Sequence, residues 1–195
     1  LARTSGQLIG TFGDLATFSF FPTKNLGAMG DGGCIVTNSD KHAEFCRLFA
    51  NHGGKNVHQF YGVNSRLDSL QAAILNAKLP YLADWTIKRI ELASNYTSRL
   101  SGVGDIYTPP LSEDSYHVFH LYTIRTNYRD QLRDFLYSHS VPSLTNYPYP
   151  LPFLPCYSDS YDPQLFPNSA LLSDTLLQLP LCPFLSEHNQ DYIIN

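Results

Sequence analysis

The first third of the chain alternates short apolar runs with glycine-rich turns, a pattern that is typical of β-hairpins. Residues 15–21 (LATFSFF) are rich in β-forming side chains and stop at Pro22, which has no N–H to offer a strand ladder. Residues 22–33 carry glycines at four positions, and residues 34–37 predict a second strand. We therefore predict two strands joined by a glycine-rich loop, a kind of segment on which functional side chains are often placed.

Helical spacing of apolar residues dominates the middle of the chain. A helix is predicted over residues 40–50 after the capping residues 38–40, and another from about Leu67, where Ser65 and Asp68 have capping-box spacing. Pro80 is expected to break the second helix, because proline lacks the N–H that a helix interior needs. A long third helix is predicted over residues 83–100, with apolar side chains spaced for one buried face.

The last third of the chain has a different pattern of apolar and polar residues. Residues 116–126 (YHVFHLYTIRT) alternate as a half-buried strand does, and a helix is predicted from Asn127 or Asp130 to Ser138. Residues 147–162 are rich in proline and tyrosine and predict an irregular loop. Residues 168–178 predict a helix, and Ser186 is expected to open a last one. The order of elements predicts a β-rich domain over residues 1–88, then a small α+β domain over residues 89–195, entered by the long helix.

Composition narrows the class of protein. With 195 residues and 43% hydrophobic content the chain suits a folded globular protein. A net charge of -4 without runs of like charge gives little basis for binding nucleic acid or an anionic membrane surface. No apolar stretch approaches the roughly 18 residues that span a bilayer. Four widely spaced cysteines without a CxxC pair predict reduced core thiols and no metal site. We expect a cytoplasmic protein.

Lys24 stands just beyond the first predicted strand, inside the glycine-rich loop. A lysine held there can bond to an aldehyde cofactor, provided that its amine loses its proton first. Ser19 lies five residues earlier, where its hydroxyl can point toward a phosphate, and glycines let backbone N–H groups approach an anion. The residues alone leave an ordinary surface lysine as the other interpretation, because strand–loop–lysine patterns are common.

Three segments resemble one known family. Residues 13–38 (GDLATFSFFPTKNLGAMGDGGCIVTN) are similar to the lysine segment of the DegT/DnrJ/EryC1/StrS aminotransferases, and residues 62–75 (GVNSRLDSLQAAIL) to a second motif. Residues 179–185 (LPLCPFL) match more weakly. The resemblance implies an α/β protein of pyridoxal-phosphate (PLP) dependent transferase fold type I, with part of the large cofactor-binding domain and the small C-terminal domain.

The resemblance assigns roles to four residues. Lys24 matches the lysine that holds PLP and moves the proton between substrate and cofactor, and Ser19 matches a serine that hydrogen-bonds the cofactor phosphate. Asn64 matches an asparagine that reaches the phosphate in the partner subunit, which implies a homodimer. Arg66 is expected to bind an anionic substrate group, with a structural salt bridge as the alternative. His120 matches a small-domain position, where a partly buried structural histidine is the favoured interpretation.

The wording of the motifs points to a substrate class. KNLGAMGDGG and NSRLD are similar to family members that act on nucleotide-linked 3-keto-6-deoxy sugars, which implies amination at C3 with glutamate as amino donor. Three positions depart from the family pattern. Asn146 and Pro152 stand where histidines are usual, and Cys182 replaces a histidine or methionine. These changes touch the substrate-side loop and leave the sugar open.

Members of this family are about twice as long as this chain. The half that precedes the matching segments carries the aspartate that pairs with the pyridine nitrogen of the cofactor. We therefore expect that the beginning of the protein is missing, and that residues 1–195 alone neither fold stably nor transaminate. The alternatives are a truncated, inactive remnant or half-domain, a sugar-nucleotide-binding module without chemistry, and a related dehydratase. The dehydratases replace the lysine with histidine, so Lys24 speaks against them.

Overall fold

The computed structural model describes residues 1–157 and 162–195. Backbone contacts divide the chain into two compact units. Unit 1 comprises Leu1–Ile87 together with Ser112–Val118, and unit 2 comprises Lys88–Leu111 together with Phe119–Asn195. The sequence predicted one boundary after residue 88, whereas the chain returns to unit 1 for the segment Ser112–Val118. Their assignment as the large and small domains of the family stays a prediction.

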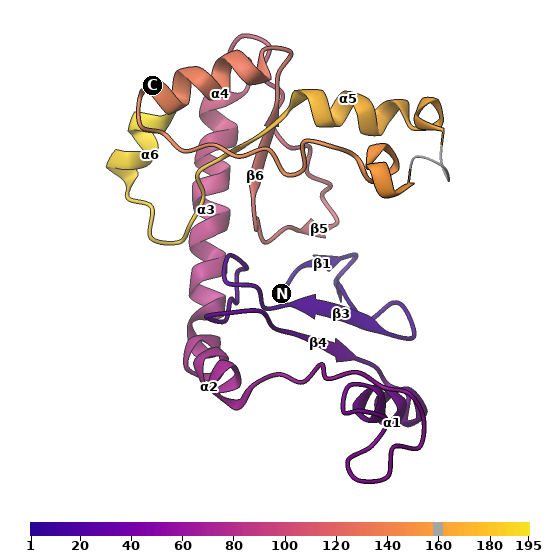
Figure 1. The fold of residues 1–195 in the computed structure, drawn as a ribbon. Helices are drawn as coiled ribbons and strands as arrows, with labels where there is room; N and C mark the ends of the chain where they lie inside the picture. Colours follow the sequence, from indigo (N-terminus) through magenta and orange to yellow (C-terminus); the bar gives the residue numbers. More distant parts are fainter. Residues whose placement is uncertain (158–161) are drawn as a thin grey trace. The chain divides into compact units, whose positions relative to one another are not determined.

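Unit 1 is built on short antiparallel strands (Figure 1). Strands β3 (Ala16–Ser19) and β4 (Gly33–Val36) pair with Ala16 opposite Val36 and Ser19 opposite Gly33. This is the predicted hairpin with its glycine-rich loop. A second sheet, which the sequence did not predict, has the order β2 (Gln7–Leu8), β1 (Arg3–Thr4) and β5 (Ser115–Tyr116). Pairing of β5 with β1 explains why Ser112–Val118 belongs to unit 1.

The predicted helices of unit 1 form with identifiable caps. Helix α1 (Asp40–Phe49) begins after Ser39, whose side chain accepts a hydrogen bond from the His42 amide. Helix α2 (Ser69–Lys78) begins after Asp68, which accepts from the Leu70 amide at 2.8 Å. The cap is thus Asp68 and the predicted capping role of Ser65 is wrong. A 3-10 turn, η1 (Leu79–Tyr81), follows at Pro80, as expected for a residue that interrupts a helix. Helix α3 (Leu82–Leu100) comes next, and the boundary between the units falls inside it.

Unit 2 pairs strand β6 (Tyr122–Arg125) with strand β7 (Leu176–Leu179) in antiparallel fashion. Its helices besides the end of α3 are α4 (Arg129–Ser138), α5 (Pro167–Thr175) and α6 (Glu187–Ile194). Short 3-10 turns η2 (Leu151–Phe153), η3 (Pro155–Tyr157) and η4 (Pro163–Leu165) occupy the segment rich in proline. The predicted irregular loop over residues 147–162 includes residues 158–161, which lie outside the described residues.

The hydrophobic core of unit 2 lies on one face of β6 and β7. Tyr122 and Ile124 of β6 and Leu177 of β7 are almost fully buried, as is Tyr96 of α3. The rings of Tyr96 and Tyr122 stack with centroids 4.9 Å apart. Because side chains alternate along a strand, the intervening residues of β6 and β7 point to the opposite face. The core is completed by smaller contributions from several elements: Ala93, Leu100, Phe119, Leu136, Val141 and Leu179.

The structure corrects two predicted elements. The strand expected over residues 116–126 is two strands, β5 and β6, separated by Phe119 with a φ of 42°. The helix expected over residues 168–178 ends at Thr175, where the chain continues as β7. The cysteine prediction is also wrong in part, because Cys156 and Cys182 are exposed.

Candidate active site

The loop that follows β3 is closed by its own backbone hydrogen bonds. The Phe20 amide donates to the Gly32 carbonyl at 2.7 Å, and the Ala28 amide donates to the Phe20 carbonyl at 2.8 Å. Within the loop, the Lys24 amide donates to the Phe21 carbonyl at 2.9 Å. These bonds fix the backbone on both sides of Lys24, so the side chain starts from a well-defined position.

Ser19 and Lys24 belong to this one turn of chain. The Ser19 hydroxyl oxygen accepts a hydrogen bond from the Phe21 amide at 3.2 Å, and Phe21 in turn accepts from Lys24. Ser19 is exposed and Lys24 is half-buried. As an acceptor toward Phe21, the serine hydroxyl keeps its hydrogen for donation to another group. The structure therefore places on one turn two of the three residues that the resemblance assigned to the cofactor, Ser19 and Lys24.

Helix α2 supports the loop from a distant part of the sequence. The ammonium of Lys78 donates to the Gly27 carbonyl at 2.6 Å, and the Gln71 side-chain oxygen accepts from the Met29 amide at 2.8 Å. Gly27 is buried, and a Cβ there would overlap the Pro22 carbonyl. Sequence reasoning missed both supports. Their spacing of seven residues on a predicted helix was a signal that they share one helix face.

Asn25, next to Lys24, holds the returning segment of unit 1. Its side-chain nitrogen donates to the Val118 carbonyl at 3.0 Å. Its side-chain oxygen is buried and has no hydrogen-bond partner among the described residues. A buried acceptor without a partner is costly, and Asn25 holds the Val118 segment through its side-chain nitrogen alone among the described residues.

Asn64 and Arg66 contact each other. The Arg66 Nε donates to the Asn64 side-chain oxygen at 3.0 Å, and both residues are exposed. The backbone of Asn64 pairs with Asn51 at the end of α1. In the described part of the chain, neither side chain is hydrogen-bonded to the lysine loop. The four predicted residues thus form two pairs, Ser19 with Lys24 and Asn64 with Arg66.

His120 lies in unit 2 and is half-buried, and its structural role stays a prediction. Its carbonyl accepts a hydrogen bond from Arg89 Nη1 at 3.3 Å. Arg89 also donates to the carbonyls of Phe119 at 3.3 Å and Leu181 at 3.1 Å. The guanidinium is buried, and removal from water lowers its pKa. Arg89 thereby ties the segment around His120 to the weakly matching motif over residues 179–185, a role that the sequence did not reveal.

The side chains of the lysine loop fit PLP. Lys24, which is half-buried, and Ser19, which is exposed, supply an amine and a hydroxyl from one hydrogen-bonded turn, and these groups match the aldehyde and the phosphate of that molecule. Among residues 1–157 and 162–195 there is no cluster of three metal-ligating side chains.

Comparison with known proteins gives the family. A profile of the DegT/DnrJ/EryC1/StrS aminotransferase family matches residues 2–195. The chain belongs to this family. A "pleiotropic regulatory protein" of Geobacillus stearothermophilus is 44% identical over 99% of this chain and 53% of its own length. A "dTDP-3-amino-3,4,6-trideoxy-alpha-D-glucose transaminase" of Streptomyces venezuelae is 40% identical over 94% of this chain and 49% of its own length.

Solved structures of the family share this backbone. DesV of Streptomyces venezuelae, crystallised with a ketimine intermediate, matches 99% of this chain and 53% of its own, with a TM-score of 0.95 and 39% identity. NtdA of Bacillus subtilis, crystallised with the cofactor pyridoxamine phosphate, matches 95% of this chain and 45% of its own, with a TM-score of 0.84 and 32% identity. The expected fold class, α/β of PLP-transferase fold type I, is confirmed.

The chain spans about half the length of the family members it matches. None of the helices in the described part of the chain is long and apolar enough to cross a bilayer.

Proposed function

We propose that the protein carrying this chain is a PLP-dependent aminotransferase that converts a nucleotide-linked keto sugar into an amino sugar. The observation that carries the proposal is the placement of Lys24 and Ser19 on one hydrogen-bonded turn within the family motif. We further propose that glutamate is the amino donor and that the amine is placed at C3 of a 6-deoxyhexose. The wording of the motifs and the 3-amino sugar named for the 40% identical relative support this position.

Lys24 is the proposed catalytic residue. Its Nζ would bond to the cofactor, which supplies the electron sink that stabilises negative charge on the substrate carbon. After the substrate displaces Lys24, its free Nζ would act as a base. It would take the proton from the substrate carbon and deliver it to the cofactor. The hydrogen-bonded loop contributes positioning, since a displacement of about 1 Å from productive geometry can cost about 100-fold in rate.

Ser19, Asn64 and Arg66 are the proposed binding residues. Ser19 would donate its hydroxyl hydrogen to the cofactor phosphate. Arg66 makes no ion pair with a described residue, so its guanidinium can take an anionic substrate group while Asn64 orients its Nε. Because Asn64 matches a family asparagine that reaches the cofactor phosphate in the partner subunit, we propose a homodimer with shared active sites.

Borohydride reduction of the full-length protein from its natural source tests the proposal. Reduction fixes a lysine-bound cofactor permanently, so peptide mapping should find reduced PLP on Lys24 in a protein about twice as long as this chain. The same preparation should transfer the amine of glutamate to a 3-keto sugar nucleotide. The Lys24→Ala variant should lose both the adduct and the turnover, whereas Lys88→Ala, which removes an exposed lysine of α3, should keep them.

Gly27→Ala supplies a graded control on the geometry. Its methyl group collides with the Pro22 carbonyl and forces the loop to shift, so turnover should fall by about 100-fold while the protein remains folded. An unmodified Lys24 in a protein of this length, without turnover, would favour the inactive remnant instead. Turnover that survives in Lys24→Ala would rule out the assigned role of this lysine.

A further inference from the structure

The outer face of the unit 2 sheet differs from its core face. Residues that face each other across β6 and β7 lie on the same side of the sheet. The pairs Tyr122–Leu179 and Ile124–Leu177 fill the core, so the alternating pairs Thr123–Gln178 and Arg125–Leu176 lie on the other side. This second face, the outer face, carries Thr123, Arg125 and Leu176 beside Gln178, which is itself buried and accepts a hydrogen bond from the Asn146 amide.

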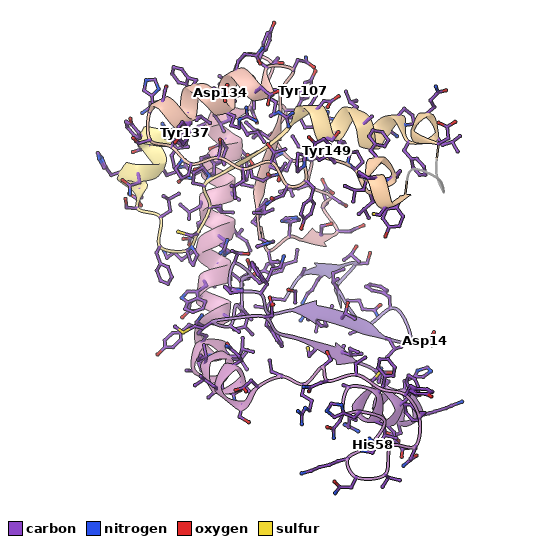
Figure 2. The ribbon with its side chains drawn as sticks, in the orientation of Figure 1. Asp14, His58, Tyr107, Asp134, Tyr137 and Tyr149 are labelled. Atoms are coloured by element: carbon purple, nitrogen blue, oxygen red, sulfur yellow. The ribbon has the colours of Figure 1, made fainter. Side chains whose placement is uncertain are left out.

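A neighbouring segment extends this face. The backbones of Tyr107 and Arg125 exchange hydrogen bonds at 2.9 and 3.0 Å, which makes them a directly opposed antiparallel pair. Their side chains therefore meet, and the Arg125 guanidinium carbon lies 5.1 Å from the centre of the Tyr107 ring. This cation–π contact holds a guanidinium in place without consuming its N–H donors in an ion pair. The position of Tyr107 in unit 2 is marked in Figure 2.

Two pockets include this Tyr107–Arg125 pair in their walls. The larger, of about 450 Å³, is also lined by Thr108, Pro109, Thr123 and Leu176. The smaller, of about 190 Å³, lies toward Thr126 and Asn127. A volume of 450 Å³ falls within the range of about 300–1,000 Å³ that is usual for small-molecule sites.

Charge favours an anion in the larger pocket. Arg125 is the one charged residue among the described residues that line it, and it forms no ion pair with any described residue. Asp105, two residues before Tyr107, lines neither pocket, and its carboxylate accepts hydrogen bonds from the Thr126 hydroxyl and the Asn127 amide. The hydroxyls of Thr108 and Thr123, which line the same pocket as Arg125, add hydrogen-bond donors for this anion.

The remaining walls favour a flat ring. Tyr107 presents an exposed ring, and Pro109 and Leu176 present apolar surface next to it. We propose that this pocket binds a small ring compound that carries a phosphate or carboxylate, with the anion on Arg125 and the ring against Tyr107 and Pro109. No residue of the pocket is among those proposed to hold PLP, so this site stands or falls separately from the proposed function.

Phenyl phosphate is a suitable probe because it joins one ring to one anion. The full-length protein is first loaded with PLP and reduced with borohydride, so that the probe finds the proposed cofactor site closed. Titration calorimetry should then give saturable binding. Phenol, which lacks the charge, and inorganic phosphate, which lacks the ring, should each bind at least tenfold more weakly.

Substitutions locate the probe. Arg125→Gln should weaken binding by about tenfold or more, since it replaces a charge-assisted pair by a neutral one. Arg133→Gln, at an exposed arginine of α4 that pairs with Asp130 and Asp134, should leave binding unchanged. Tyr107→Ala should weaken binding and Tyr107→Phe should preserve it.

Each outcome decides the proposal. Saturable binding that is lost in Arg125→Gln and in Tyr107→Ala supports it. Equal binding by the parent protein and either variant would overturn it, as would the absence of saturable binding, including the case in which another part of the protein fills the pocket. If Arg125→Gln lacks a cooperative melt, Tyr107→Ala decides, because its side chain is 60% exposed and its removal leaves the core intact.

Discussion

The two units of this chain are stabilised by different means. In unit 2 a continuous cluster of buried side chains joins α3, β6 and β7, whereas in unit 1 the buried hydrophobic residues, among those described, are Ala28 and Leu75. Unit 1 is held largely by hydrogen bonds within and between its loops, and its hairpin exposes Phe18 and Ile35. The residues proposed to perform the chemistry lie on unit 1. The residues proposed for catalysis therefore lie on the unit that buries fewer of its own hydrophobic side chains.

The largest expected effect comes from a matched pair of isoleucines. Ile124 in β6 is 1% exposed and Ile35 in β4 is 52% exposed. In the full-length protein, Ile124→Ala should lower the free energy of unfolding by about 2–5 kcal/mol, through lost burial and the cavity left behind, and Ile35→Ala by less than about 1 kcal/mol. Urea unfolding followed by circular dichroism measures both.

The same pair tests what covers the hairpin in the full-length protein. A cost at Ile35 close to the cost at Ile124 would show that another segment of the protein packs on β4. A cost at Ile124 as small as that expected at Ile35 would contradict the difference between the units.

Two cations that donate to backbone carbonyls give the next effect. Arg89 in unit 2 serves three carbonyls, and Lys78 in unit 1 serves one. Arg89→Met removes the donor from three carbonyls, of which the Phe119 contact is buried and the other two are part-buried, and should cost about 3 kcal/mol, while Lys78→Met should cost about 1 kcal/mol. Thermal melts of the two variants beside the parent chain provide the measurement. A larger loss of stability in Lys78→Met than in Arg89→Met would contradict this order. It would show that the hydrogen bond from Lys78 to the Gly27 carbonyl is the more important of the two supports.

The smallest effect concerns acid. Hydrogen bonds from Thr126 and from the Asn127 amide lower the pKa of Asp105. A lowered pKa in the folded state adds stability above the ordinary aspartate pKa of about 3.9, and that contribution disappears as the pH falls through the folded-state value. Thr126→Val should thus be more destabilising at pH 7 than at a pH below the folded-state pKa of Asp105, where the pH-independent loss of the hydrogen bond from the Tyr128 amide remains.

A threonine of unit 1 supplies the control for this pH dependence. The Thr37 hydroxyl donates to the Asp14 backbone carbonyl at 2.7 Å, and a carbonyl does not titrate in this range. Thr37→Val should therefore carry the same cost at pH 3 and pH 7. Parallel pH profiles for the two variants would mean that the Asp105 carboxylate does not contribute through its charge.

Local patterns in the sequence predicted most elements of the fold, and the failures share one cause. The stretch LLSDTLLQLP satisfies a helical and a strand period equally, and pairing of Leu176–Leu179 with β6 decides the outcome. Residues 116–126 alternate throughout, yet β5 pairs with β1 and β6 with β7. Which strand a segment pairs with depends on distant residues, and one sequence does not reveal it.

The residues of the candidate site show the same difference between local patterns and contacts with distant residues. Lys24 and Ser19 were predictable because their motif is contiguous, and the loop holds them together through short-range bonds. The supports from Gln71, Lys78 and Arg89 span 30 to 92 residues and were missed. Their roles depend on tertiary contacts that no local pattern records.

The return of Ser112–Val118 to unit 1 limits how this gene can be divided. A fragment that begins at Lys88 carries β5 without β1, and a fragment that ends at Ile87 leaves β1 with one edge unpaired. If the C-terminal part were exchanged between relatives, the sheet of β2, β1 and β5 would therefore contain strands from two different proteins. To keep β5 with its own β1, a chimera would need a crossover on each side of β5. Unit 2 therefore cannot be transferred between relatives by a single crossover.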